Sequence, residues 1–328
     1  MNQNYSEHLE AFIAEKKAAT NLIKSVGHLL YNKGIELVLF RRHLIDTNVS
    51  EILRLHQYAR DFVKKPINIF DSAQLANQLT NMDLAPAKID IGKLTFEYLA
   101  KKDNTIHLED FLNQKIGFIK NSKDKIQKSK DVVLYGFGRI GRLCARELIK
   151  QAGKGQQLRL KGIILRKIDA TSLHKRCALL RQDSVHGNFS SSIQINENEL
   201  SIIINGQKIQ FFDEKTKHTL KEHGINDALL IDNTGVFKNK EELSQHLQVD
   251  QINRVLLTAP GRGIANIVYG VNHQKIDIDT DLIISAASCT TNAIAPILKV
   301  ISEHNNIEKG HIETIHAYTN DQILLDNM

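Results

Sequence analysis

One segment constrains the fold of this chain more than any other: a short apolar run followed directly by three closely spaced glycines. The run ends at Tyr135, then come Gly136, Gly138 and Gly141, and residues 142–150 have a helical pattern. Between a strand and a helix, the first glycine permits a tight turn, the second lets the backbone approach a pyrophosphate, and the third lets the helix pack on the strand. The helix N-terminus then faces the anion. The segment predicts a dinucleotide-binding turn, with a merely structural glycine turn as the alternative.

Short apolar runs rich in Ile, Val and Leu recur after residue 131 and alternate with helical segments. They lie at 132–135, 162–165, 228–231, 255–258 and 282–285. Such continuous runs are typical of strands buried on both faces of a parallel sheet. Segments 193–195, 200–204 and 208–212 instead predict an antiparallel meander, because Asn205-Gly206 favours a type I′ turn. The expected fold class is α/β: a Rossmann-type doubly wound parallel sheet with an inserted antiparallel piece.

The N-terminal part has a different pattern, in which apolar residues recur at steps of three and four and predict helices. One helix should cover the apolar stripe of residues 8–30, a second should begin after Asn48, and a third should have Asp71 as its N-cap. Residues 115–130 then carry six lysines and one acidic residue, which is typical of an exposed connector. These patterns predict a helical N-terminal extension over residues 1–128.

Composition and charge exclude several classes of protein. Hydrophobic residues make up 42% and charged residues 24% of the chain, which is a globular composition. No apolar run is long enough to cross a bilayer, and no secretory signal is readable at the N-terminus. Most of the net charge of +6 lies in residues 1–130, which hold 20 Lys and Arg against 15 Asp and Glu. We interpret this excess as a solvated surface rather than a nucleic-acid interface, because aromatic residues are not interleaved with it.

The three cysteines, Cys144, Cys177 and Cys289, lie far apart in the sequence. They form no CxxC pair and no Cys/His cluster at zinc spacing, so we expect neither a disulfide framework nor a metal site. Free thiols are typical of a reducing compartment, and the expected localisation is cytoplasmic, with no membrane partner.

The end of the second predicted strand bears on the choice of cofactor. A dinucleotide-binding sheet usually has an acidic residue there, which binds the adenosine ribose. Here the strand ends in Arg166 and Lys167, and the nearest acidic residue is Asp169. A guanidinium can bind the 2′-phosphate that a carboxylate would repel. The sequence therefore predicts that NADP is tolerated or preferred over NAD; the alternative is that Arg166 stacks on adenine or points to solvent.

The stretch Ser288-Cys289-Thr290-Thr291-Asn292 is the strongest candidate for catalysis. It follows a predicted strand and precedes a predicted helix over 293–301. A cysteine there meets the positive end of the helix dipole and free backbone N–H groups, which favour the thiolate and can bind an oxyanion. His316 lies in the segment 313–319, which has the pattern of the next strand and would bring a base beside the sulfur. The alternatives are a small buried cysteine and a core histidine.

Seven motifs, in this order, resemble glyceraldehyde-3-phosphate dehydrogenases, and the resemblance covers residues 131–328. The motifs are GFGRIGR at 136–142, DSVHGNF at 183–189, NTGVF at 233–237, LLTAPG at 256–261, YGVNH at 269–273, ASCTTN at 287–292 and HAYTNDQ at 316–322. The N-terminal extension, which the motifs do not cover, is similar to that of longer bacterial members of the family.

The resemblance implies roles for individual residues. Cys289 would be the nucleophile and His316 its base, whereas His186 would have no catalytic role. The residues expected to contact the cofactor are Gly136, Gly138, Arg139, Ile140, Gly141, Arg166, Thr234, Gly235 and Thr258. Those expected to contact the substrate phosphate or inorganic phosphate are Ser288, Thr290 and Thr319.

The implied activity is the phosphorylating oxidation of glyceraldehyde 3-phosphate, in the glycolytic or the biosynthetic direction. A thiolate adds to the aldehyde, hydride passes to NAD or NADP, and inorganic phosphate releases the acyl group from the resulting thioester. The alternatives are a related cysteine dehydrogenase of another phosphorylated aldehyde and a catalytically inert NAD(P)-binding interaction protein. A homotetramer is expected for the complete protein.

The family's catalytic domain is much longer than the 39 residues that follow Cys289. The resemblance therefore implies an extension over 1–128, a Rossmann domain over 129–288 and an incomplete α+β catalytic domain over 289–328. Such a chain would be a fragment, and we expect it to bind the dinucleotide poorly and to turn over little.

Overall fold

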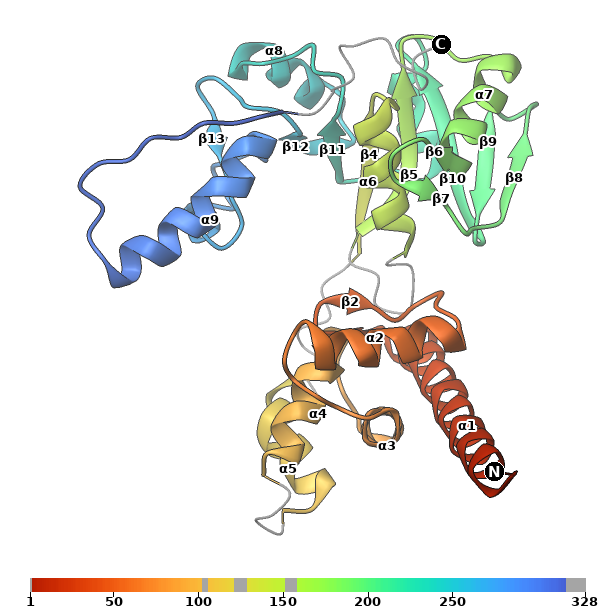
Figure 1. The fold of residues 1–328 in the computed structure, drawn as a ribbon. Helices are drawn as coiled ribbons and strands as arrows, with labels where there is room; N and C mark the ends of the chain where they lie inside the picture. Colours follow the sequence, from red (N-terminus) through yellow and green to blue (C-terminus); the bar gives the residue numbers. More distant parts are fainter. Residues whose placement is uncertain (1, 102–105, 121–128, 151–157, 317–328) are drawn as a thin grey trace. The chain divides into compact units, whose positions relative to one another are not determined.

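A computed structural model describes residues 2–101, 106–120, 129–150 and 158–316 (Figure 1). The chain divides into two compact units, one made of residues 1–129 with 150–157 and the other of residues 130–149 with 158–328. Each of the three buried apolar clusters draws its residues from a single unit. Among the described helices, none combines the length and apolar character of a membrane span.

The first unit is mainly helical, as expected, but it also holds a small sheet. Its helices are α1 (Asn2–Lys33), α2 (Val49–Asp61), α3 (Ile69–Asn81), α4 (Ile91–Leu99), α5 (Leu108–Ile116) and the 3-10 turn η2 (Gly117–Ile119). Its strands are β1 (Ile35–Leu39), β2 (Arg42–His43) and β3 (Ala87–Asp90). They are ordered β2-β1-β3, with β1 antiparallel to β2 and parallel to β3. The helical periodicity around them gave no sign of this sheet.

Three expectations for this unit can be compared with the structure. The helix expected after Asn48 is confirmed as α2, and the Asn48 side chain caps it by accepting a hydrogen bond from the backbone N–H of Glu51. The prediction of Asp71 as the cap of α3 is wrong: Asn68 caps the helix and accepts from the N–H of Asp71 at 2.8 Å. Asp71 lies in the first turn, where its negative charge is favourable beside the helix N-terminus. The connector also starts later than residue 115, because α5 continues to the buried Ile116.

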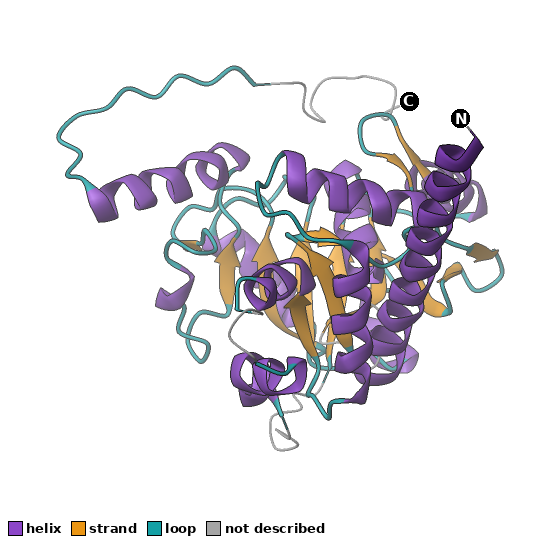
Figure 2. Ribbon diagram, turned by 60° about the horizontal axis from the view of Figure 1, so that its bottom comes forward, coloured by secondary structure: helices purple, strands orange, loops and turns teal. Residues whose placement is uncertain are grey.

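The second unit is built on a nine-stranded sheet, whose strands are orange in Figure 2. In sequence order they are β4 (Lys130–Tyr135), β5 (Leu158–Leu165), β8 (Ile193–Asn196), β9 (Ser201–Ile204), β10 (Gln207–Asp213), β11 (Ala228–Asp232), β12 (Ile252–Leu257), β13 (Ala265–Asn266) and β14 (Ile283–Ser285). A separate antiparallel pair consists of β6 (Gln182–Asp183) and β7 (Gly187–Asn188).

Helices pack on both faces of the central strands, with α6 and α7 on one face and η4 and α8 on the other. The described helices of this unit are α6 (Arg139–Lys150), α7 (Ala170–Arg181), η4 (Lys217–His223), α8 (Lys240–Ser244), η5 (Gln245–Gln248), η6 (His273–Lys275) and α9 (Cys289–His304), and neither η6 nor α9 has a buried residue. Val132 and Leu134 of β4 pack with residues of α6 and α7, whereas Val133 packs with residues of η4 and α8. Alternate residues of one strand thus enter two cores, and this explains why the central strands are continuously apolar.

The strand order is β13-β14-β12-β11-β4-β5-β10-β9-β8, and all strands from β13 to β10 are parallel to their neighbours. The chain leaves β4 towards β5 and β10, and later returns to the other side of β4 as β11 and β12. The predicted doubly wound Rossmann sheet is therefore confirmed, with its switch point between β4 and β11. The predicted meander is also confirmed, and Asn205 and Gly206 have φ values of 48° and 81° in its turn.

Candidate active site

A cleft of about 620 Å³ opens where β4, β5 and β11 end, beside the switch point of the sheet. Its lining residues are Tyr135, Gly136, Phe137, Gly138, Ile164, Leu165, Arg166, Lys167, Arg176, Glu214, Thr234, Val236 and Phe237. Four of the predicted cofactor residues are therefore in its wall: Gly136, Gly138, Arg166 and Thr234. In open α/β sheets, ligands bind at this place, outside the carboxyl ends of the strands.

Two glycines of the turn are required by close packing. Gly136 has a φ of 88°, and a Cβ there would lie 2.9 Å from Cγ2 of Thr234. A Cβ on Gly141 would lie 2.4 Å from the backbone oxygen of Gly136. Because no side chain fits at either position, the backbone of the turn stays open to the cleft, as a pyrophosphate requires.

The other predicted cofactor residues are not among those that line the cleft. Arg139 and Ile140 begin α6, and 45% of Ile140 is exposed. Gly235 lies in the exposed loop after β11 with a φ of 70°. Thr258 follows β12 and donates from its N–H and its hydroxyl to the backbone oxygen of Asp232.

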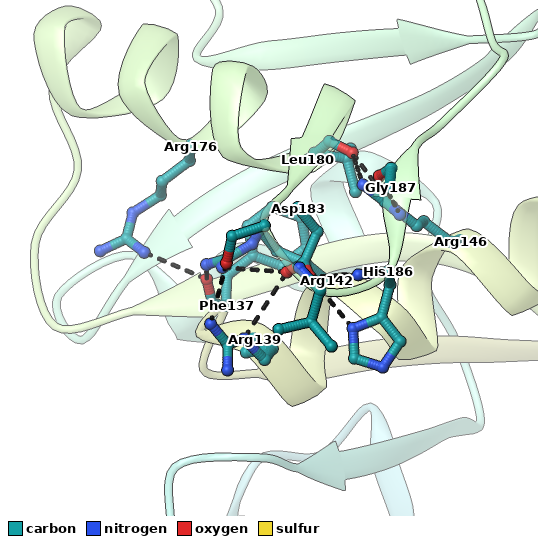
Figure 3. Close-up of polar contacts among 11 residues, drawn as sticks. Phe137, Arg139, Arg142, Arg146, Arg176, Leu180, Asp183, His186 and Gly187 are labelled. Atoms are coloured by element: carbon teal, nitrogen blue, oxygen red, sulfur yellow. Dashed lines mark hydrogen bonds and ion pairs between the residues drawn. The ribbon is translucent and has the colours of Figure 1, made fainter. Parts of the chain in front are cut away.

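Asp183 anchors the turn from the segment that follows α7 (Figure 3). Its carboxylate accepts from the N–H groups of Val185 and His186, and lies 3.6 Å from Nε of Arg139. Arg142 and Arg176 both donate to the backbone oxygen of Phe137, at 3.4 Å. The predicted structural role of the DSVHGNF motif thus has a physical basis: it binds charged residues of the glycine turn.

Sequence reasoning did not find several residues in the wall of the cleft. Arg176 comes from α7 and Glu214 follows β10. The Tyr135 hydroxyl donates to Glu214; burial and this carboxylate raise the pKa of Tyr135. Burial raises the pKa of Glu214, but hydrogen bonds from Lys217 and Tyr135 outweigh it and lower that pKa. No local motif marked these positions, because only the sheet brings them together.

Cys289 is the first residue of α9 and is exposed. The helix begins four residues earlier than the predicted Ala293, because Ser288 caps it: the Ser288 hydroxyl oxygen accepts from the N–H of Thr291 at 2.9 Å. Thr290, with its hydroxyl oxygen 4.0 Å from Sγ, is the next residue. The cysteine therefore lies at the positive end of the helix, as its sequence context predicted.

His316 lies beside this cysteine, with its Nε2 3.1 Å from Sγ of Cys289. The hydrogen bond with His316 is the largest influence on the thiol and lowers the pKa of Cys289; contacts with Thr290 lower it further. Burial raises the pKa of the Cys144 thiol, and raises the pKa of Cys177 to about 11. The structure thus distinguishes one exposed, acidified thiol from two less acidic ones.

The segment that carries His316 differs from its prediction. Residues 306–316 form no strand in the structure, so the strand expected over 313–319 is wrong for residues 313–316. A strand needs a hydrogen-bonded neighbour, and these residues are exposed and pair with none of the described strands. The remainder of that segment, including the predicted phosphate-binding Thr319, lies outside the described residues. No group of three His, Cys, Asp or Glu able to hold a metal ion occurs within the described ranges.

Two family profiles match this chain. The profile described as "Glyceraldehyde 3-phosphate dehydrogenase, NAD binding domain" matches residues 130–240. The profile for the C-terminal domain of the same family matches residues 288–328. The two matches correspond to the cleft and to the segment with Cys289 and His316.

Individual relatives agree with the profiles. A glyceraldehyde-3-phosphate dehydrogenase-like protein of Pseudomonas aeruginosa is 41% identical over 312 residues, which are 93% of this chain and 67% of that protein. The glyceraldehyde-3-phosphate dehydrogenases of Chlamydia muridarum and Thermotoga maritima are 36% and 38% identical over 196 residues, or 60% of this chain. This chain spans about 56% of the length of those two enzymes. The chain belongs to the glyceraldehyde-3-phosphate dehydrogenase family, whose members are NAD-dependent oxidoreductases.

Proposed function

We propose that this chain carries the nucleophile, the base and the dinucleotide site of a phosphorylating glyceraldehyde-3-phosphate dehydrogenase. One observation carries the proposal: the 3.1 Å contact between Sγ of Cys289 and Nε2 of His316 at the start of α9. An exposed thiol with a lowered pKa beside an imidazole has the arrangement of an activated nucleophile. The names of the relatives support the same substrate class.

The residues of the cleft fit a nicotinamide dinucleotide. Side chains are excluded at Gly136 and Gly141, which leaves room for a pyrophosphate near the N-terminus of α6. Arg139, Ile140 and Gly235 would contact the cofactor around the turn, and Thr234 would line its pocket. When bound, the nicotinamide ring supplies an acceptor for hydride.

The protein's own groups would perform the proton and acyl transfers. His316 takes the thiol proton, and passes it to the carbonyl oxygen as Sγ of Cys289 attacks the aldehyde carbon. Nε2 then takes the proton back from the hydroxyl of the thiohemiacetal as hydride leaves, which gives a thioester on Cys289. Inorganic phosphate attacks the thioester and releases an acyl phosphate and the free thiolate. Thr290 and Thr319 would bind phosphate groups, and Ser288 would contribute through the helix turn that it caps.

A burst assay tests this proposal. The chain is mixed with glyceraldehyde 3-phosphate, NAD and inorganic phosphate, and reduced nicotinamide is followed by absorbance. We expect the native chain to form a small but measurable amount of reduced cofactor, in keeping with its expected low turnover, and Cys289→Ser to form none. A native chain that gives no reduction, or a Cys289→Ser variant that reduces the cofactor equally well, would contradict the proposal. Retained dinucleotide binding without any reduction would favour the inert interaction protein.

Cationic residues at the adenosine end of the cleft support NADP as a second cofactor. Arg166 and Lys167 follow β5, and Arg176 reaches the same cleft from α7. The carboxylate of Asp169 is used as the N-cap of α7, where it accepts from the N–H of Ser172 at 2.7 Å. The acid that follows the strand end in the sequence is therefore occupied, and a 2′-phosphate would meet the guanidinium groups of Arg166 and Arg176.

Binding of cofactor fragments separates the two dinucleotides without catalysis. We expect 2′,5′-ADP to bind more tightly than 5′-AMP, and Arg166→Ala to remove most of that difference, whereas Lys215→Ala outside the cleft lining should leave it unchanged. Equal binding of both fragments to the native chain would exclude the 2′-phosphate site and leave NAD as the cofactor.

A further inference from the structure

Asp232 is a fully buried acidic residue at the end of β11, where it is 0% exposed. One carboxylate oxygen accepts two hydrogen bonds from Thr234, from its N–H at 2.8 Å and from its hydroxyl at 2.7 Å. The backbone oxygen of Asp232 accepts two more from Thr258, at 3.0 Å from N and 2.9 Å from Oγ1. Asp232 thus holds the start of the loop that follows β11 and the start of the loop that follows β12.

The second carboxylate oxygen of Asp232 binds His246, which is 5% exposed and belongs to η5. The distance from Nε2 to Oδ2 is 3.0 Å. Because a carboxylate only accepts hydrogen bonds, Nε2 carries the proton and donates it. The imidazole is fixed by two aromatic rings: that of Tyr135, at 4.6 Å between centroids, and that of Phe237, at 5.0 Å.

The loop held in this way forms part of the cleft wall. Thr234 lines the cleft and lies against Gly136, the first glycine of the turn. Its hydroxyl oxygen also accepts from the N–H of Val236, which lines the cleft as well. The contacts run in series from His246 through Asp232 and Thr234 to the glycine turn.

From this chain of contacts we infer that Asp232 and His246 are positioning residues of the dinucleotide site. They hold the loop after β11 in its binding conformation before the ligand arrives, so that binding does not have to order it. The inference rests on the proposed function, since it takes the cleft to be the dinucleotide site. Neither residue lines the cleft, so neither is expected to touch the ligand.

Three variants test the inference in the full chain, with NAD affinity measured by calorimetry. His246→Phe keeps the ring but removes the donor, and we expect NAD binding to weaken roughly tenfold, as for a lost hydrogen bond to a charged group. His246→Gln restores a donor and should recover most of the affinity. Asp232→Asn keeps the shape of the side chain and removes its negative charge, and it should weaken NAD binding about threefold to tenfold. This variant tests the inference even if His246→Phe folds poorly.

A matched control distinguishes positioning from general destabilisation. His56 is also a buried histidine with two hydrogen bonds, but it lies in the first unit. His56→Phe should lower thermal stability and leave NAD affinity unchanged. The alkylation rate of Cys289 should be unchanged in all these variants. Unchanged NAD affinity in His246→Phe and Asp232→Asn, or an equal loss of NAD affinity in His56→Phe, would overturn this inference and leave the proposed function standing. A native chain that binds neither NAD nor NADP would overturn it together with the proposed function.

Discussion

Cys289 differs from the other two cysteines in its exposure and in the acidity of its thiol. It is exposed, and His316 lowers its pKa, whereas burial raises the pKa of Cys144 and Cys177. The reactive species is the thiolate, whose fraction at a given pH rises as the pKa falls. Selectivity between the thiols is therefore a direct test of the site.

Iodoacetamide at neutral pH should label Cys289 before Cys144 and Cys177, as peptide mapping by mass spectrometry would show. Because the folded pKa of Cys289 is lowered, its labelling rate should reach its plateau at a lower pH than that of an ordinary thiol. His316→Ala should shift the rate profile to higher pH, whereas His304→Ala, at the far end of α9, should not. An unshifted profile in His316→Ala would show that the imidazole does not acidify the sulfur.

The environment of Asp183 should make the free energy of unfolding depend on pH. Burial raises its pKa, but hydrogen bonds from His186 and Val185 and the charge of Arg139 outweigh it and lower the pKa to about 2. A carboxyl with a lowered folded pKa stabilises the fold above its unfolded pKa and loses this contribution as the pH falls through the folded value. The contribution of Asp183 at neutral pH is then about 2 kcal/mol.

Asp183→Asn should lower the free energy of unfolding by about 2 kcal/mol at neutral pH. The difference from the native chain should shrink as the pH falls from 4 towards 2, because the native carboxyl is then protonated as well. Urea unfolding at a series of pH values would measure it, with the exposed Asp250→Asn as the control. A difference that stays constant down to pH 2 would show that this carboxyl is not the cause.

At the scale of elements, two glycines lead to opposite expectations. Gly206 lies in the hairpin between β9 and β10 with a φ of 81°, and no atom lies within 4 Å of a Cβ built there. Gly27 lies inside α1, where an added Cβ would only contact the Tyr31 ring at 3.9 Å. The first substitution strains the backbone, and the second removes the conformational entropy of an unfolded glycine.

Gly206→Ala should therefore lower the free energy of unfolding by about 1 kcal/mol, whereas Gly27→Ala should raise it by about 1 kcal/mol. Chemical denaturation followed by circular dichroism would measure both, and the native chain is the reference. If the two substitutions change stability in the same direction, backbone conformation is not what decides their effects.

At the scale of the whole molecule, the two units have separate cores. Leu22 and Phe111 are fully buried in the first core, and the residues that line the cleft beside the switch point all belong to the second unit. A ligand stabilises the part of the protein that binds it. A core substitution and a ligand should therefore act on different units.

Calorimetry should resolve two unfolding transitions, and NAD should raise the midpoint of only one. Leu22→Ala should lower the midpoint of the other, because creating a cavity at a buried leucine costs about 3 kcal/mol. If there is a single transition, and NAD and Leu22→Ala both shift its midpoint, the two units unfold together.

The parallel strands, the glycine turn, the Asn205-Gly206 hairpin and the place of Cys289 at a helix N-terminus could all be predicted from sequence. In each case the signal is local: a run of β-branched residues, a required backbone conformation, or a place between a strand and a helix. Local signals were less reliable for helix starts. Both Asn68 and Asp71 are residue types that cap helices, and the sequence did not show which of them caps α3. Ser288 caps α9, so this helix begins at Cys289 and not at the predicted Ala293.

The sequence by itself determined which residues become the central strands and which thiol lies between a strand and a helix N-terminus, because neighbours along the chain impose both. Only the tertiary structure decided which distant side chains share the cleft: Arg176 from one helix, Glu214 from the end of another strand, and the buried pair of Asp232 and His246 behind its wall. The order of the strands in the sheet brings these groups together, and this order cannot be read from the spacing of the residues along the chain. The small sheet of the first unit has the same origin, since β1 pairs with β3 across some fifty residues of helix and loop.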